Sequence, residues 1–339
     1  MTHRTSPSGS DQPLDTAYDT ALLDLDGVVY TGGDAIAHAV DSLAAAGSDG
    51  MRLAYVTNNA ARTPETVAEH LTRLGVPADA EDVITSAQAV ARLIADHVPA
   101  GSKVLAVGGE GLFAALRERG LQPVESADDS PAAAVQGYGP ELRWSQLAEM
   151  AHAVNAGVPW FASNTDLTIP SARGIAPGNG AAVEVVRIAT GGSPQVAGKP
   201  LPPMHRETVL RTGAKRPLVV GDRLDTDIEG AYAGGVDSLL VLTGVTKPAD
   251  LIAAEPHHRP TYVAADLRGL LVAHPSVEWD GSRATCGGWT ATASGGSLDL
   301  TGSGETADGL RAVCCAAWSL ADSASSDLDP SKALARLGL

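Results

Sequence analysis

Short apolar runs that alternate with helical segments are the most restrictive feature of this sequence. Residues 20–27 predict a short buried strand that runs directly into a turn, a helix follows over about 34–46, and a second apolar run occupies 53–56. Thr63 and Pro64 then predict a helix N-cap with proline at the first helical position. Strand–helix–strand–helix order at this spacing predicts a Rossmann-like, doubly wound parallel sheet of the α/β class.

The pattern is interrupted and later resumes, which indicates more than one domain in a chain of 339 residues. Strand-like runs return late in the chain, so residues 19–86 and 194–273 are expected to form one core. Residues 87–193 contain strands and helices of their own and predict an inserted α/β domain. Short alternating strands and one amphipathic helix predict a small α+β appendix over 274–339. Residues 1–18 are polar and rich in Ser, Thr, Pro and Asp, which predicts a disordered tail.

The charge and the apolar content exclude several classes of partner. The formal net charge is -16, so nucleic acid or an anionic membrane surface would meet a repulsive field. No run approaches the ~18 apolar residues that span a bilayer, and the N-terminus lacks the apolar stretch of a signal peptide. The three cysteines have no metal-ligand or disulfide spacing, so we expect a cytoplasmic protein.

Two carboxylates follow the first predicted strand. Asp24 and Asp26 are two residues apart, so both side chains can face one crevice at the strand end, where open α/β sheets place their sites. One carboxylate can attack phosphorus while the other protonates the leaving oxygen and later activates water. Gly27 permits a sharp turn that can expose amides to an anion. A strand-end pair that only caps the next turn remains the alternative.

Two further clusters could hold a phosphoryl group. Thr57, Asn58 and Asn59 follow the second strand and offer a hydroxyl and amides just before a helix. Lys199 lies between Gly198 and Pro200 and supplies a point charge on a constrained loop. Either cluster alone is also typical of an ordinary turn or a solvated surface.

A last cluster of acidic residues follows the strand predicted near residue 218. Asp222 lies at the strand end and is the natural oxygen ligand for magnesium, whereas Asp227 would orient a metal-bound water or Lys199. Arg223 and Asp225 are expected at the surface. Carboxylates brought this close to a phosphate require a bound cation, so Mg²⁺ is the expected cofactor.

Four motifs stand in a fixed order along the chain and resemble those of the haloacid dehalogenase (HAD) superfamily of phosphatases. The motifs are Asp24-x-Asp26-Gly27-Val28, Thr57-Asn58-Asn59, Gly198-Lys199-Pro200 and Gly221-Asp222-x4-Asp227. More narrowly, the chain resembles the NagD-like, 4-nitrophenylphosphatase-type branch, which carries an α/β cap between the second and third motifs. The block over 87–193 fits that cap, and the resemblance covers about residues 18–272.

The resemblance also implies residue roles. Asp24 would be the nucleophile and Asp26 the acid/base, while Thr57, Asn58 and Lys199 hold phosphate. Magnesium would bind Asp24, the Asp26 carbonyl and Asp222. Nothing transfers to the appendix, which could stabilise the core or form a homodimer contact.

The expected substrate is a small phosphate ester, with glycerol 3-phosphate first and 2-phosphoglycolate second. Residues 163–180 of the cap contain no Phe, Tyr or Trp on which a ring could stack, which disfavours pyridoxal phosphate or a nucleotide. The choice of glycerol 3-phosphate also draws on the resemblance, and Arg173 would favour a carboxylate. A phosphomutase and a phosphometabolite-binding sensor are the alternative functions.

One pair of histidines lies outside all of these motifs. His257 and His258 stand near Glu255 and suggest either a metal site or a proline-flanked polar loop, of which the loop is the commoner case.

Overall fold

The structure is a computed structural model that describes residues 4–171, 173–294, 296–321 and 328–339. Its internal contacts separate the chain into two compact units. Unit 1 comprises Met1–Thr31, Ala35–Leu53 and Ala214–Leu339, and unit 2 comprises Gly32–Asp34 and Ala54–Gly213.

Unit 1 is built on a parallel sheet whose strands run in the order β15-β14-β13-β1. These strands are short and almost wholly buried, as expected for a parallel sheet covered on both faces. The elements are β1 (Thr20–Leu23), β13 (Pro217–Gly221), β14 (Asp237–Val241) and β15 (Tyr262–Ala264), with helices α1 (Leu14–Ala17), α2 (Ala39–Ser48), α9 (Glu229–Gly234) and α10 (Pro248–Ile252). The predicted α/β class is confirmed.

The register of β1 and β13 decides where the polar side chains lie. Leu23 pairs with Val220 in parallel alignment, so Asp24 and Asp222 leave the sheet at the same edge. The amide of Asp24 still donates to the carbonyl of Val220 over 2.8 Å, which fixes the first residue after β1 to its neighbour.

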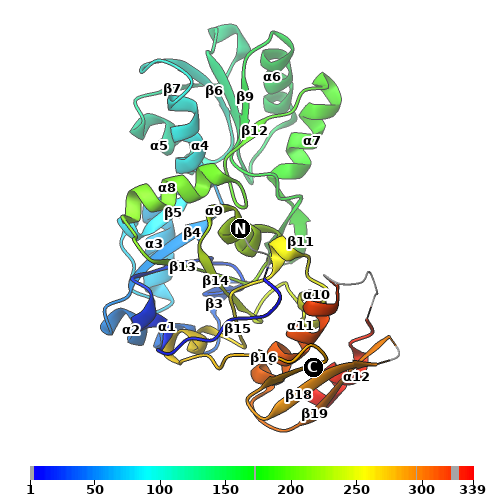
Figure 1. Cartoon of the computed structure of the whole chain (residues 1–339). Helices are drawn as coiled ribbons and strands as arrows, with labels where there is room; N and C mark the ends of the chain where they lie inside the picture. The colour runs from blue at the N-terminus through cyan, green and yellow to red at the C-terminus, as the bar shows by residue number, and fades with distance from the viewer. Residues whose placement is uncertain (1–3, 172, 295, 322–327) are drawn as a thin grey trace. The chain divides into compact units, whose positions relative to one another are not determined.

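Unit 2 contains a second α/β arrangement. A parallel sheet runs in the order β12-β9-β8-β6-β7, and β4 pairs with β5. Helices α4 and α5 lie on one side of the five-stranded sheet and α6 and α7 on the other (Figure 1). The elements are β4 (Arg52–Thr57), α3 (Pro64–Arg73), β5 (Val83–Thr85), α4 (Ser86–Ala95), β6 (Lys103–Val107), α5 (Glu110–Glu118), β7 (Gln122–Val124), β8 (Ala133–Gln136), α6 (Trp144–Asn155), β9 (Trp160–Ala162), β10 (Thr168–Ser171), β11 (Gly174–Pro177), α7 (Asn179–Thr190), β12 (Gln195–Val196) and α8 (Pro202–Thr212).

A buried carboxylate connects helices within unit 2. Glu207 on α8 is 0% exposed and accepts hydrogen bonds from Arg92, from Arg119 Nη2 at 2.9 Å and from Arg211 Nε at 2.5 Å. Burial raises the pKa of Glu207, but the hydrogen bonds from Arg92 and Arg211 and the surrounding arginine charges outweigh it, so the pKa is lowered overall.

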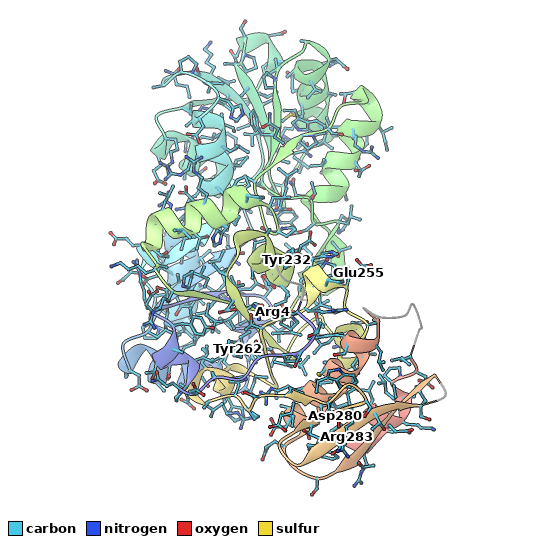
Figure 2. All side chains as sticks on the ribbon, in the orientation of Figure 1. Arg4, Tyr232, Glu255, Tyr262, Asp280 and Arg283 are labelled. Atoms are coloured by element: carbon cyan, nitrogen blue, oxygen red, sulfur yellow. The ribbon has the colours of Figure 1, made fainter. Side chains whose placement is uncertain are left out.

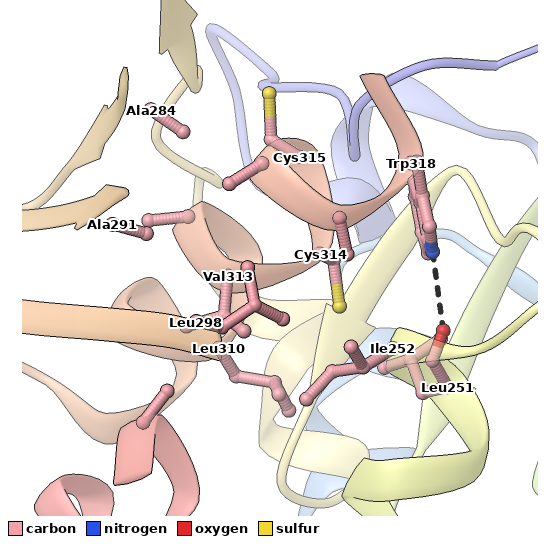
Figure 3. Packing of buried hydrophobic residues seen from close by; sticks show 14 of the residues in the cluster. Leu251, Ile252, Ala284, Ala291, Leu298, Leu310, Val313, Cys314, Cys315 and Trp318 are labelled. Atoms are coloured by element: carbon pink, nitrogen blue, oxygen red, sulfur yellow. Dashed lines mark hydrogen bonds between the residues drawn. The ribbon is translucent and has the colours of Figure 1, made fainter. Parts of the chain in front are cut away.

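The C-terminal segment forms an antiparallel sheet, as its alternating sequence predicts. The strand order is β16-β17-β18-β19, and α11 packs on this sheet. Its core is continuous with the parallel part of unit 1, because Cys314 and Trp318 belong to the same buried cluster as Leu251 (Figure 3). The elements are β16 (Glu278–Trp279), β17 (Arg283–Cys286), β18 (Trp289–Ser294), β19 (Ser297–Gly302), α11 (Thr306–Ala321) and α12 (Ser331–Leu337).

The N-terminal segment differs from the disordered tail expected over 1–18. From Arg4 onward it is placed, and Met1–His3 lie outside the described residues. The amide of Ser8 donates to Thr261 and that of Ser10 to His274, each over 2.8 Å, while Leu14 is 0% exposed. Backbone pairing with distant residues and one buried leucine therefore give this polar segment its structure.

Candidate active site

Three carboxylates converge at the edge of the unit 1 sheet. Asp24 follows β1, Asp222 follows β13, and Asp227 lies in the helical turn η3 (Leu224–Ile228). One carboxylate oxygen from each lies within 4.8 Å of the other two. Asp222 is 0% exposed and Asp227 2%, so both depend on groups inside the protein for stabilisation.

Asp222 is held by two backbone amides and two glycines. Its Oδ2 accepts from the amide of Val245 over 2.6 Å, and its carbonyl accepts from Thr246 over 3.1 Å. A Cβ at Gly27 would lie 2.5 Å from Asp222 Oδ2, and one at Gly244 would lie 2.5 Å from Asp222 Cγ. Both positions must therefore lack a side chain for Asp222 to keep its place.

Asp227 is fixed in a similar way. Its Oδ2 accepts from the amide of Arg223 over 3.2 Å, and Gly221 leaves room for its Cβ. The side chain of Arg223 pairs instead with Asp225, which is in accord with a peripheral role for both.

This donor set fits magnesium. Mg²⁺ prefers carboxylate oxygens and is usually bound through one or two of them with waters completing the shell. The Asp24, Asp222 and Asp227 carboxylates provide such oxygens, two of them buried, and their mutual repulsion is relieved by a divalent cation. Sequence reasoning assigned Asp227 a supporting role, whereas the structure groups its carboxylate with the other two.

Asp26 and Gly27 lie in the turn after β1. Asp26 is half-buried, and its carboxylate is outside the cluster of three identified in the described part of the chain. Gly27 has φ of 87° and donates its amide to Tyr30 over 2.9 Å. Gly27 thus contributes space beside Asp222, and its amide is engaged within the turn instead of pointing at an anion.

A second polar group lies in unit 2 and is centred on Asn58. Its side-chain amide donates to Asp166 Oδ2 over 3.1 Å and to the carbonyl of Lys199 over 3.2 Å. Its carbonyl accepts from Ser86 Oγ and from Asn164 Nδ2, each over 2.6 Å. Asn58 therefore connects segments that are more than a hundred residues apart in sequence.

Lys199 is positioned by the same asparagine. Its amide donates to Asn58 Oδ1 over 2.8 Å, and its ammonium donates to the carbonyl of Val56 over 3.1 Å. Gly198 is required here because a Cβ would lie 2.6 Å from Asn58 Oδ1. The predicted second and third motifs, Thr57–Asn59 and Gly198–Pro200, are thus brought together within unit 2.

Thr57 and Asn59 complete this group. Thr57 is 4% exposed and its Oγ1 accepts from the amide of Asn59 over 3.1 Å, while Asn59 Oδ1 accepts from Ala61 over 2.9 Å. These bonds fix the turn that follows β4.

Sequence reasoning missed Ser86, Asn164 and Asp166 as members of this group. Asn164 and Asp166 follow β9, and polar residues directly after a strand were the signal used for the other motifs. That signal could have identified Asn164 and Asp166, and it applies equally to Ser86, which directly follows β5 and begins α4.

No helix in the described part of the chain combines the length and apolar character needed to cross a membrane.

Family models match most of the chain. A haloacid dehalogenase-like hydrolase model matches residues 21–122, and a HAD-hydrolase-like model matches residues 196–270. A third model, of a GCN5-related N-acetyltransferase like domain, matches residues 286–339.

Two relatives of this chain are phosphatases. The chain is 45% identical over 316 residues to the D-glycerol 3-phosphate phosphatase of Mycobacterium tuberculosis. The aligned region covers 89% of this chain and 86% of the relative. It is 38% identical to the acid sugar phosphatase of Staphylococcus aureus (strain USA300) over 74% of this chain and 95% of the relative.

A solved structure extends the likeness to the whole fold. The crystal structure of the glycerol phosphate phosphatase of M. tuberculosis in complex with magnesium has a TM-score of 0.86 and 42% identity, over 96% of this chain and 99% of that one. The motif order, the carboxylate cluster and these matches agree. This chain belongs to the haloacid dehalogenase-like hydrolases, among their magnesium-dependent phosphatases.

Proposed function

We propose that this phosphatase hydrolyses glycerol 3-phosphate through an aspartyl-phosphate intermediate on Asp24. The observation that carries the substrate is the 45% identity to a D-glycerol 3-phosphate phosphatase, which extends over 89% of this chain. The position of Asp24 supports its role, because its carboxylate belongs to the cluster at the sheet edge and remains half-buried.

In the first step the carboxylate of Asp24 attacks phosphorus, and the ester oxygen leaves with a proton from Asp26. In the second step Asp26 takes a proton from water, whose oxygen attacks the phosphorus and releases phosphate and free Asp24. Asp24, the carbonyl of Asp26 and Asp222 would hold magnesium, with Asp227 in support. When bound, the metal neutralises charge on the carboxylates and on the phosphoryl oxygens.

Thr57, Asn58, Asn59 and Lys199 hold the phosphoryl group in this proposal, with Gly27 leaving space beside Asp222. Two observations support this role: the turn after β4 is fixed, and Lys199 carries an ammonium group. Because the net charge of -16 repels a phosphate, a local positive charge such as that of Lys199 is needed to bind one.

We further propose that residues 87–193 form the substrate-selecting cap, that 19–86 and 194–273 form the catalytic core, and that 274–339 is an appendix. A separate cluster of buried apolar side chains, from Leu105 to Val186, supports the cap as a folding unit. Selectivity between phosphate esters then depends on the cap, since the core of a site of this type contacts mainly the phosphate and the metal.

The surface of the hairpin formed by β10 and β11 helps to distinguish between the candidate substrates. Ile169 pairs with Ala176, and the exposed side chains include Leu167 at 62% and Ile175 at 75%. The hairpin thus offers aliphatic and not aromatic surface, which disfavours stacking of a pyridoxal ring or nucleobase. Arg173 is exposed in this segment and would favour 2-phosphoglycolate, the second candidate.

The test is a comparison of kcat/KM for glycerol 3-phosphate, 2-phosphoglycolate, pyridoxal 5′-phosphate and uridine monophosphate. We expect the two small esters to be preferred by about tenfold or more, roughly 1.4 kcal/mol in transition-state binding. A tenfold preference for either ring-bearing ester would contradict the assignment of the cap. Free phosphate as product excludes a phosphomutase, and turnover excludes a sensor.

We also propose a cytoplasmic location and no nucleic-acid partner. All three cysteines are free and buried, which suits a reducing compartment, and the net charge of -16 opposes nucleic acid.

A further inference from the structure

Two histidines and a glutamate form a cluster in unit 1 that the phosphatase chemistry does not use. Glu229 begins α9, while His257 and His258 belong to the short 3-10 helix η4 (Pro256–His258). One ligand atom from each of these three residues lies within 4.8 Å of the other two. His258 Nε2 and Glu229 Oε2 are 3.0 Å apart, and the two imidazole rings are 4.1 Å apart at their centroids.

The local backbone brings these side chains together. The amide of His258 donates to the carbonyl of Glu255 over 2.8 Å, which closes the turn, and η4 packs beside α9. Tyr232, one turn after Glu229 on α9, has its ring 6.5 Å from that of His257. Figure 2 labels Tyr232 and Glu255 at this corner of unit 1, where they flank the cluster.

The ligand set differs in kind from that of the carboxylate site. Two imidazoles with one carboxylate form a set that zinc uses with an open fourth position. Around zinc at about 2.0–2.1 Å, tetrahedral ligand atoms lie roughly 3.4 Å apart, so His258 and Glu229 are already near the required separation. The ligand atom of His257 lies within 4.8 Å of the other two, so a shift of at most roughly 1.4 Å, which a half-buried side chain on a short turn can make, completes the set.

A second carboxylate supports a metal here. Glu255 Oε2 lies 3.8 Å from His257 Nδ1, where it can orient the imidazole, as carboxylates commonly do for metal-bound histidines. The side chains of Glu229, His257 and His258 are 36%, 39% and 24% exposed, so an ion can reach them from solvent. The simpler interpretation, a hydrogen-bonded His258–Glu229 pair, accounts for neither His257 nor Glu255.

We propose that Glu229, His257 and His258 form a second metal site that takes a transition-metal ion of the zinc class. Magnesium, which prefers oxygen ligands, occupies the carboxylate site, and zinc, which imidazole suits, occupies this one. Because Glu229 directly follows η3, which carries Asp227, an ion here ties η4 to the segment that leads into the carboxylate cluster.

The test measures zinc retained by the full chain after incubation with zinc, followed by gel filtration in excess Mg²⁺ that keeps the oxygen site filled. We expect wild type to retain about one more zinc per chain than His257→Ala/His258→Ala. Co²⁺ in place of zinc should give the visible absorption of a low-coordinate nitrogen site in wild type and not in the double-histidine variant. His152→Ala, an exposed histidine elsewhere, is the matched control and should bind as wild type.

Thermal unfolding distinguishes a variant that has lost a metal ligand from one that fails to fold. Zinc should raise the Tm of wild type and of His152→Ala and leave that of Glu229→Gln unchanged, since a ligand stabilises only the state that binds it. Phosphate release should persist in all three variants. Equal zinc retention by wild type and by the folded double-histidine variant, or no zinc retained by wild type, would overturn the proposal.

Discussion

Gly244→Ala tests whether the position of Asp222 controls catalysis. A Cβ at residue 244 would lie 2.5 Å from Cγ and 2.9 Å from Cβ of Asp222, whereas ordinary contacts begin at 3.4 Å. The Asp222 side chain must therefore move by about an ångström, which also breaks its 2.6 Å bond from the amide of Val245. A displacement of this size at a catalytic group costs on the order of 10²-fold in rate, or about 2.7 kcal/mol.

The assay is phosphate release from glycerol 3-phosphate across a magnesium titration. We expect Gly244→Ala to lower kcat and to raise the magnesium concentration needed for half-maximal rate. Gly47→Ala is the matched control, because a Cβ there meets only Leu53 at 3.8 Å and alanine favours helix α2. Wild-type kcat and magnesium dependence in a folded Gly244→Ala protein would refute this account of Asp222.

Four further predictions concern the chemistry and the core. Asp24→Asn should abolish turnover while leaving the protein folded, because an amide cannot form the acyl phosphate; steady-state phosphate release would contradict it. EDTA should remove activity and Mg²⁺ restore it, with Ca²⁺ a poor substitute, as titration of initial rates will show. Glu207→Ala should lose about 3–5 kcal/mol in urea unfolding, because Arg92 and Arg119 lose their carboxylate partner and Arg211 keeps only Glu118, whereas Arg206→Ala, from an exposed pair, should lose under about 1 kcal/mol. Trp318→Ala should lose about 3–5 kcal/mol while the folded protein keeps its kcat, a split that unfolding and rate measurements together resolve.

The sequence allowed the sheet and the motif order to be predicted because both depend on local signals. A buried apolar run followed by polar residues marks the end of a parallel strand, and Asp24 and Asp222 both stand at such ends. The mutual position of Asn58 and Lys199 also agrees with the pairing of the second and third motifs. The first of these features requires only that parallel strand ends meet at one edge of a sheet, whereas Asn58 and Lys199 follow strands of two different sheets.

Features set by tertiary contact could not be predicted in the same way. Gly244 follows β14, and no residue near it in the sequence indicates a special role. Its role depends on a tertiary contact, because the Asp222 side chain lies where a Cβ at residue 244 would be. Residues from Arg4 to Tyr18 have the composition of a tail, but the amides of Ser8 and Ser10 bond to carbonyls about 250 residues later. Glu229 joins His257 and His258 only because α9 and η4 are packed together.

The appendix illustrates how a segment can lie outside the chemistry and still belong to the fold. All four motifs precede residue 274, so the chemical step is expected to need none of its residues. Nevertheless Trp318 Nε1 donates to the carbonyl of Leu251 over 3.2 Å, and Arg311 Nη2 donates to that of Val263 over 2.6 Å. Because β15 and α10 of the parallel part share these contacts, the appendix contributes to the stability of the sheet that carries Asp222. Loss of a side chain there should therefore change the free energy of unfolding and not the rate constant of the folded enzyme.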